Sequence, residues 1–237
     1  MFKTESQDVS KMSSLHAGTN LSGAKRPNQS VAAIVPAYNE AHTVGDILHV
    51  LQQCPDIDEV IVVNDGSSDD TAEIAARLGV RVLNLYPNRG KGGAMKAGAQ
   101  VTTADILLFI DADLLGLKDS HCCDLLRPVL DGRADMTIGV FVGGRPATTL
   151  AQKITPFLSG QRAIRREIIE DIPELEESRY GVEVAISRYA ASKCIRVEKV
   201  LLQDVSQIMK EEKQGFLPGA KNRFKMYWEI LKVLGQK

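Results

Sequence analysis

From residue 31 onward, short apolar runs alternate with longer stretches of mixed polarity. Four such runs lie in the first half of the chain: VAAIV at 31–35, EVIVV at 59–63, VRVLNL at 80–85 and ILLFI at 106–110. They are rich in β-branched and aliphatic residues, which is typical of strands buried on both faces in a parallel sheet. The pattern therefore predicts four parallel strands in this half.

The stretches between these runs have the spacing of amphipathic helices. After the first run, four apolar residues share one helical face: Val44, Ile47, Leu48 and Leu51. After the second run a shorter group does the same, with Ser68 or Asp69 as its N-cap: Ile74, Ala75 and Leu78. A third helix is predicted over residues 91–101. Because strands and helices alternate, we predict an α/β fold with a mostly parallel central sheet and helices on both faces.

The pattern is less regular in the second half. DMTIGV at 135–140 and CIRVEKVLL at 194–202 predict strands, and residues 148–170 and 180–192 predict helices. Residues 1–30 contain little apolar periodicity and are expected to be a flexible leader.

The tail over 206–237 is expected to contain an amphipathic helix, whose apolar residues are Phe224, Tyr227, Trp228, Leu231 and Leu234. This helix has two interpretations: it packs on the domain or on a second copy in a homodimer, or it holds an anionic membrane surface. The second interpretation relies on four basic residues: Lys221, Arg223, Lys225 and Lys232.

Composition excludes several classes of protein. The 237 residues carry a net charge of −1, which provides no global basic field for nucleic acid. The four cysteines have no CxxC spacing, so we interpret them as buried or incidental thiols in a reducing compartment, not as a zinc site or a disulfide framework. Neither a secretory signal nor an apolar run long enough for a membrane helix is visible. The expected location is cytoplasmic, with peripheral contact at the inner membrane face under the second interpretation of the tail.

Polar clusters follow the strands of the first half. In PAYNE (36–40), Pro36 is expected to stop the strand, and the segment is either a capped turn or a site where Glu40 binds a ribose hydroxyl. In NDGSSDD (64–70), Asp65 and Gly66 form either a capped turn or a site where Asp65 accepts a hydrogen bond from a base edge. Ligands of open α/β sheets bind outside the carboxyl ends of the strands, so these clusters are expected to converge.

NRGKGG (88–93) is a glycine-rich turn with a lysine. It matches neither a Walker A loop nor a GxGxxG fingerprint, since position 95 is Met. Glycines beside Lys91 at a helix start suit an anionic ligand, whereas a lysine in solvent is the plainer alternative.

DAD (111–113) places two carboxylates directly after an apolar strand. Mutual repulsion opposes this arrangement unless a cation is bound, and Asp111 and Asp113 are ligands of the kind that Mg²⁺ or Mn²⁺ accepts beside a diphosphate. In the structural alternative, Asp113 caps the next helix and Asp111 pairs with a lysine. An aspartyl phosphatase with Asp111 as nucleophile is a further alternative, although that motif usually follows the first strand of its domain.

The four clusters together resemble those of the family 2 glycosyltransferases of GT-A fold. The matching segments are IVPAYNE, VIVVNDGSSDDT, NRGKGGAMKAG and ADILLFIDADL, roughly over residues 31–115. The resemblance implies a single GT-A-type domain, with a nucleotide-sugar-binding half over 31–115 and an acceptor-binding half over 116–205. It also implies Mg²⁺ or Mn²⁺ as cofactor and a UDP- or GDP-sugar as donor.

The resemblance also implies the residues that contact this donor: Pro36, Ala37, Tyr38, Glu40, Asp65, Gly66, Lys91, Asp111, Ala112 and Asp113. Asp113 would bind the metal and the diphosphate and act in catalysis. Asp111 would contact the ribose or the metal, and Lys91 would lie near the base or the phosphates.

The second half is similar to two groups with phosphate-bearing acceptors. LSGQRAIRREIIEDIP resembles a stretch of polyprenyl-phosphate sugar synthases, and YGVE resembles glucosyl-3-phosphoglycerate synthases. We therefore assign five residues to the acceptor: Ser159, Gly160, Arg162, Arg165 and Arg166. Arginine suits bidentate phosphate contacts, although a solvated helix face paired with Glu167 and Glu170 is the alternative.

Two departures from the family pattern affect the assignment. Where many relatives have a Glu-Asp pair, this chain has only Glu183. Either Glu183 is the catalytic base, or the reaction needs no base because the acceptor is already ionised. Where some relatives place a metal-binding histidine, this chain has Gln207. The predicted function is a metal-dependent glycosyltransferase, with an aspartyl phosphatase or a non-catalytic nucleotide-sugar-binding protein as the alternatives.

Overall fold

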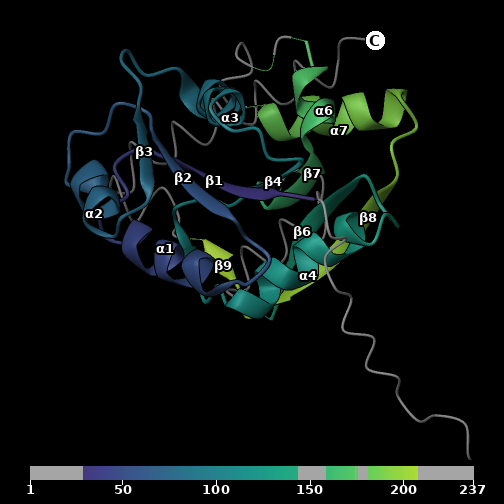
Figure 1. The fold of residues 1–237 in the computed structure, drawn as a ribbon, viewed down its shortest axis with the longest axis horizontal. Coiled ribbons are helices and arrows are strands. Elements are labelled where there is room, and N and C mark those ends of the chain that lie inside the picture. Colours follow the sequence, from purple (N-terminus) through teal and green to yellow (C-terminus); the bar gives the residue numbers. More distant parts are fainter. Residues whose placement is uncertain (1–28, 144–158, 174, 176–180, 208–237) are drawn as a thin grey trace, which may run out of the picture.

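A seven-stranded mixed sheet forms the centre of the protein (Figure 1). The computed structural model describes residues 29–143, 159–173, 175 and 181–207. Along the chain the strands of this sheet are β1 (Val31–Ala37), β2 (Glu59–Asn64), β3 (Arg81–Asn84), β4 (Ile106–Phe109), β6 (Met136–Val142), β7 (Arg162–Arg165) and β8 (Val197–Gln203). Their spatial order is β3-β2-β1-β4-β7-β6-β8. β7 is antiparallel to both neighbours and the other pairs are parallel, which confirms the mostly parallel sheet.

Helices cover both faces of the sheet, as predicted (Figure 1). One face carries α1 (Val44–Gln53), α2 (Thr71–Arg77) and α4 (Asp119–Leu130), and the other carries α3 (Gly90–Gln100), α6 (Arg166–Glu170) and α7 (Val182–Ser192). Side chains of β1 alternate between the two cores: Val31, Ala33 and Val35 contribute to the first, and Ala32 and Ile34 to the second. A strand buried on both faces needs apolar residues at every position, which explains the continuous run in the sequence.

Pro36 does not stop its strand, contrary to expectation. β1 continues to Ala37, and Pro36 is in register with Val63 of β2. Backbone groups of a strand alternate between its two neighbours, and Ile34 accepts the last hydrogen bond on the β4 side, from Ile110. The missing N–H of Pro36 therefore falls where pairing with β4 has already ended, so the strand loses no ladder bond.

The helix predicted over 148–170 is wrong for the part of it that the structure describes. Residues 162–165 form β7, and only the five residues of α6 are helical. Ala163 and Ile164 are fully buried between β4 and β6, so burial in the sheet outweighs the helical propensity of this stretch. The N-cap of α2 is Asp70, not Ser68 or Asp69, although the Asp69 Oδ1 accepts the Thr71 N–H at 3.1 Å.

A small second sheet joins the carboxyl edge of the main sheet to the end of the described chain. Its strands are β5 (Leu114–Leu115) and β9 (Ser206–Gln207), paired antiparallel with Leu114 opposite Gln207. Most of the expected leader and tail, including the tail helix, lies outside the described residues, so the division into segments stays a prediction. Among the described helices, none combines the length and apolarity that crossing a membrane requires.

Candidate active site

The carboxyl ends of β1 and β4 lie side by side. Between these two strands the order of strands in the sheet changes direction. β2 and β3 follow β1 on one side, and β4 lies on its other side. This topological switch point is where open α/β sheets bind ligands. PAYNE follows β1, NDGSSDD follows β2, NRGKGG opens α3, and DAD follows β4, so all four clusters lie along this edge.

Hydrogen bonds tie the PAYNE loop to the NDGSSDD loop. The Asn39 N–H donates to Ser67 Oγ at 2.9 Å, and the Glu40 N–H donates to Thr71 Oγ1 at 2.8 Å. Asn39 has a φ of 57°, which turns the chain sharply before α1. Tyr38 is 52% exposed at the start of this turn. The two loops are thus one fixed wall, with an aromatic side chain available at its surface.

Asp65 is buried and links β2 to the start of α3. Its carboxylate Oδ1 accepts the Arg89 N–H at 2.7 Å, and its backbone carbonyl accepts a hydrogen bond from Asn88 Nδ2 at 2.7 Å. Gly66 follows with a φ of +78°, a conformation that favours glycine. The hydrogen bond from the Arg89 N–H gives one carboxylate oxygen of Asp65 a structural role. The contact of Asp65 with a nucleobase stays a prediction.

Lys91 lies between two carboxylates from distant parts of the chain. Its Nζ is 2.6 Å from Asp111 Oδ1 and 2.6 Å from Glu183 Oε1. Burial lowers the pKa of Lys91, but the attraction of these two carboxylates more than offsets that effect and holds the pKa above its usual range. The ammonium is therefore charged at neutral pH, and it compensates the like charges that DAD brings to this edge. The alternative of a lysine in solvent is wrong.

The other oxygen of Asp111 is held by two glutamine side chains. Asp111 Oδ2 accepts hydrogen bonds from Gln161 Nε2 at 3.0 Å and from Gln207 Nε2 at 2.8 Å. Gln207 Nε2 also lies 3.4 Å from Asp113 Oδ1. The pairing of β9 with β5 explains how a residue so late in the chain reaches these aspartates. The predicted ligand trio of Asp111, Asp113 and Gln207 is thus brought together.

The structural alternative for DAD is half observed. Asp111 does pair with a lysine, but Asp113 does not cap the next helix, because the N-cap of α4 is Lys118. Asp113 is partly exposed beside the buried Ala112, so its carboxylate is accessible at the sheet edge.

Arg162 is fully buried and does not present its guanidinium to solvent. Its Nε donates to the Ser159 carbonyl at 2.9 Å, and its Nη2 lies 3.2 Å from both the Glu183 carbonyl and Ser187 Oγ. Burial lowers the pKa of Arg162 to about 10, despite the opposing charges of Glu183 and Asp111. Arg162 therefore joins the segment before β7 to the first turn of α7.

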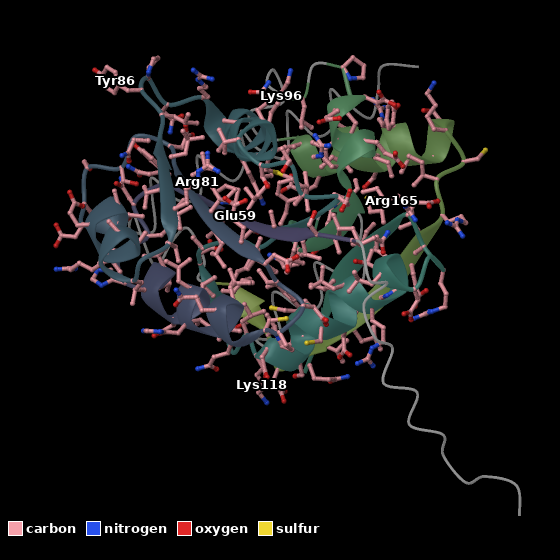
Figure 2. All side chains as sticks on the ribbon, viewed as in Figure 1. Glu59, Arg81, Tyr86, Lys96, Lys118 and Arg165 are labelled. Atoms are coloured by element: carbon pink, nitrogen blue, oxygen red, sulfur yellow. The ribbon has the colours of Figure 1, made fainter. Side chains whose placement is uncertain are left out.

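Arg165 and Arg166 lie at the opposite edge of the sheet, so the expected cluster of three arginines does not form. Antiparallel pairing sets Arg162 opposite Phe109 at the carboxyl end of β4, and Arg165 opposite Ile106 at its amino end. These ends are about 10 Å apart along the strand. Arg165 lies 3.4 Å from Asp135, and Arg166 pairs with Glu170 at 2.7 Å, as in the alternative of a solvated helix face. Figure 2 labels Arg165 in this position.

Gly160 lies directly against the site, and the buried Ser159 reaches it through Gln161. Ser159 Oγ donates to Gln161 Oε1 at 2.8 Å. A Cβ on Gly160 would collide with Asp111 Oδ2 and Lys91 Nζ, so only glycine lets the backbone pass this close to the ion pair.

Comparison with known proteins agrees with the arrangement of strands and clusters. The family model for glycosyl transferase family 2 matches residues 32–193, which is more than half of the chain. The chain belongs to glycosyl transferase family 2.

Similar members of this family include two bacterial enzymes. Glucosyl-3-phosphoglycerate synthase of Mycobacterium tuberculosis H37Rv is 28% identical over 200 residues, and the match covers 69% of this chain and 61% of that enzyme. A 4,4'-diaponeurosporenoate glycosyltransferase of Staphylococcus haemolyticus is 39% identical over 104 residues, covering 41% of this chain and 28% of that enzyme. The chain thus spans about three fifths of the length of the mycobacterial relative.

Solved structures support the GT-A fold. The M. tuberculosis synthase in complex with Mn²⁺, UDP and glucosyl-3-phosphoglycerate has a TM-score of 0.70 at 24% identity, covering 87% of this chain and 79% of that one. The same synthase with Mn²⁺, UDP-glucose and phosphoglyceric acid has a TM-score of 0.63 at 25% identity, covering 79% and 77%. The similarity extends well beyond residue 115, into the half assigned to the acceptor.

For this family 2 glycosyl transferase, the side chains at the DAD edge fit a divalent cation. Two carboxylates and one amide oxygen are hard ligands of the kind that Mg²⁺ and Mn²⁺ prefer. In this structure the Lys91 ammonium and the Gln207 amide NH₂ lie against the aspartates, so one cation and one neutral hydrogen-bond donor are already placed where negative charge is concentrated. A rotation of the Gln207 amide would present its oxygen instead.

Family membership gives no support to the phosphatase alternative. Both oxygens of Asp111 accept close contacts, from Lys91 on one side and two glutamines on the other. An aspartyl nucleophile needs one oxygen directed at an incoming phosphorus atom.

Gln161 is the site residue that sequence reasoning missed. It is fully buried, it holds Asp111, and it is held in turn by Ser159. It stands inside the SGQRAIRRE stretch, where the neighbouring arginines dominated the assignment. The available signal was a polar amide side chain placed between the small residues Ser159 and Gly160 and the apolar residues of a buried strand.

Proposed function

We propose that this chain transfers a hexose from a UDP-sugar to a small phosphorylated acid, and that the transfer depends on Mg²⁺ or Mn²⁺. The observation that carries the proposal is the convergence of Lys91, Asp111, Asp113 and Glu183, from three separate segments, at the switch point of the sheet. The nucleotide-sugar and acceptor complexes of the mycobacterial synthase support the choice of substrates.

The donor nucleoside is proposed to lie over the fixed wall made by the PAYNE and NDGSSDD loops. Tyr38 is exposed there for stacking, Glu40 would accept a hydrogen bond from a ribose hydroxyl, and Asp65 would accept one from a base N–H. Pro36, Ala37 and Gly66 would form the floor beneath the base, and Ala112 the floor beneath the ribose.

The diphosphate is proposed to lie against Lys91 and the DAD aspartates. Asp111, Asp113 and Gln207 would hold the cation. When bound, such an ion neutralises charge on the departing diphosphate. Lys91 is already charged and fixed at this place, so it adds stabilisation without reorganising during the reaction.

In the proposed reaction, the bond between the anomeric carbon and the β-phosphate oxygen breaks. A new bond forms between that carbon and an acceptor oxygen, and UDP leaves. If the attacking group is a hydroxyl, its proton must depart, and Glu183, whose Oε1 lies 2.6 Å from the Lys91 ammonium, is the carboxylate that would accept it. If the attacking group is an ionised phosphate, no base is required.

The acceptor is proposed to lie beside Ser159 and Gly160, where the lack of a side chain on Gly160 lets the backbone pass against the ion pair of Lys91 and Asp111. Arg162 is proposed as a positioning residue, because its guanidinium hydrogen bonds hold Ser159 and the first turn of α7 together. Arg165 and Arg166 are not proposed to bind the acceptor, since they lie at the other edge of the sheet.

A polyprenyl phosphate is the second candidate acceptor. A dolichyl-phosphate β-glucosyltransferase of Trichomonas vaginalis is 38% identical, but over 94 residues that cover 34% of this chain. The likeness to the mycobacterial synthases covers twice that share, which favours the small acid. Membrane contact through the tail helix and a homodimer concern residues outside the described part and remain predictions.

The proposal can be tested with the purified full chain. A thermal-shift screen of UDP, GDP and their glucose and mannose conjugates, each with and without Mn²⁺, should show stabilisation by the uridine compounds that requires Mn²⁺. Transfer to 3-phosphoglycerate and to a detergent-dispersed polyprenyl phosphate is then measured. Metal-dependent UDP binding without transfer to any acceptor would instead identify a non-catalytic binding protein, and phosphate release without a nucleotide sugar would identify a phosphatase.

Replacing Lys91 by Met should lower kcat/KM for the nucleotide sugar roughly 10- to 100-fold, because one fixed positive charge beside the diphosphate is lost. The same change leaves Asp111 and Glu183 without their shared cation. Lys96, the other lysine of α3, is the matched control, since Lys96→Met removes the same charge from the same helix. Equal activity losses in the two variants would contradict a specific role for Lys91.

A further inference from the structure

Two cysteine sulfurs meet on the face of the sheet that carries α1 and α4. Cys54 is the C-cap of α1, Cys123 lies in the second turn of α4, and their Sγ atoms are 3.4 Å apart. The two helices pack side by side beneath the sheet (Figure 1). Cys54 is buried, whereas Cys123 is partly exposed, so the pair can be reached from solvent.

A carboxylate completes this group. Asp56 follows Cys54 in a tight turn that is closed by a hydrogen bond from the Ile57 N–H to the Cys54 carbonyl at 3.2 Å. The turn brings one carboxylate oxygen of Asp56 and both sulfurs within 4.8 Å of one another. Among the described residues, no other group of three such ligands is this compact.

The distances suit a thiophilic cation. Zn²⁺ binds thiolate sulfur at about 2.3 Å and carboxylate oxygen at about 2.0–2.2 Å, so its tetrahedral ligands are separated by somewhat less than about 4 Å. The sulfurs need to shift only a few tenths of an ångström to meet this geometry, and partial exposure leaves a fourth position for water. Soft sulfur ligands also distinguish this group from the all-oxygen set at the DAD edge.

We propose that Cys54, Cys123 and Asp56 form a second metal site, selective for Zn²⁺ or a similar soft divalent ion. Binding forms two metal–sulfur bonds and releases the two thiol protons to the buffer. The ion would connect the C-terminal end of α1 to α4. This end of α1 is about 15 Å from the PAYNE loop, which lies at its other end. The site is therefore structural and independent of the proposed transfer reaction.

A disulfide between Cys54 and Cys123 is the rival use of the same sulfurs. It would need an oxidant, and it gives the Asp56 carboxylate no role. Thiolates are required both for disulfide exchange and for metal binding, but only a cation uses the carboxylate as a ligand. Spacing along the sequence does not reveal the group, because 69 residues separate the two cysteines and only the packing of α1 on α4 brings them together.

The test uses the reduced, metal-free full chain titrated with Co²⁺ under argon. We expect one equivalent to produce a thiolate-to-cobalt charge-transfer band, Zn²⁺ to abolish it, and Zn²⁺ to raise the melting temperature. Cys54→Ser and Cys123→Ser should lose most of the band and weaken Zn²⁺ binding at least roughly 100-fold, as measured against a chromophoric chelator. Asp56→Asn should keep the band and weaken binding roughly 10-fold or more.

Cys194→Ser is the matched control, because Cys194 is exposed after α7, away from this group. Asp113→Asn is a second control, which separates this site from the DAD edge; both should retain the band. Each variant is first compared with the parent by circular dichroism without metal, and Cys123→Ser suffices if Cys54→Ser does not fold. Absence of the band in the parent chain, or equal loss in Cys194→Ser, would overturn the proposal. The proposal would also be overturned if the chain were isolated with a Cys54–Cys123 disulfide and bound no Co²⁺ once that disulfide had been reduced.

Discussion

Asp113→Asn is expected to lower kcat at least roughly 1,000-fold, which corresponds to about 4 kcal/mol of lost transition-state stabilisation. Asp113 is partly exposed at the carboxyl edge of β4, and its Oδ1 shares the Gln207 amide with Asp111. Replacing a carboxylate by an amide removes one negative charge from the proposed cation site while keeping the size of the side chain. Single-turnover assays at saturating UDP-sugar, over a range of Mn²⁺ concentrations, measure the effect.

Asp124→Asn is the control for this substitution, because Asp124 is an exposed aspartate of α4 that undergoes the same chemical change. It should leave both kcat and Mn²⁺ affinity at the parent values. The melting temperature of Asp113→Asn without metal should stay close to that of the parent, which shows that the loss is not a folding defect. Undiminished turnover in the folded Asp113→Asn protein would remove the metal role of this residue.

Arg162→Ala is expected to destabilise the protein by about 3–5 kcal/mol. The guanidinium is fully buried, and its removal leaves the Ser159 carbonyl without this donor, takes one of two donors from the Glu183 carbonyl, and creates a cavity. This is a large part of the about 5–15 kcal/mol that stabilises a typical domain. Urea unfolding should show a lower midpoint with an unchanged slope, and the melting temperature should fall by roughly 10 °C.

Arg166→Ala provides the comparison, because Arg166 belongs to the same sequence motif but forms an exposed pair with Glu170. Such a helix-surface pair contributes only about 0.3–0.5 kcal/mol. Arg166→Ala should also leave the KM for the phosphorylated acceptor unchanged, since the residue is at the amino end of the strands. A raised acceptor KM in Arg166→Ala, with stability intact, would restore the original hypothesis that this arginine binds phosphate.

The sequence was informative wherever structure is set by local pattern. β1, β2 and β4 are buried on both faces, so each appears as an uninterrupted apolar run, and the helices between them must alternate with parallel strands. Because such strands end at one edge, PAYNE and DAD could be assigned to a common site before any coordinates were known. The resemblance to the glycosyltransferase family then added Gln207 to the two aspartates that the DAD pattern had already assigned to a metal.

The arginine motif shows what local pattern cannot provide. Its residues favour a helix, yet the space between β4 and β6 is filled by this segment as an antiparallel strand. Strand geometry sends Arg162 and Arg165 to opposite edges of the sheet, whereas a helix would have kept the three arginines near one another. The choice depends on contacts with strands that are distant in sequence, so neither propensity nor charge pattern could decide it.

The pairing of β5 with β9 has a consequence for how the protein is made. Asp113 immediately precedes β5, but Gln207 belongs to β9, at the end of the described chain. At about 5–20 residues per second, a ribosome needs roughly 5–20 s to travel from the aspartates to this glutamine. During that interval the nascent chain can hold a sheet edge with both aspartates and no third ligand. Completion of the proposed metal site therefore has to wait until residue 207 has been synthesised.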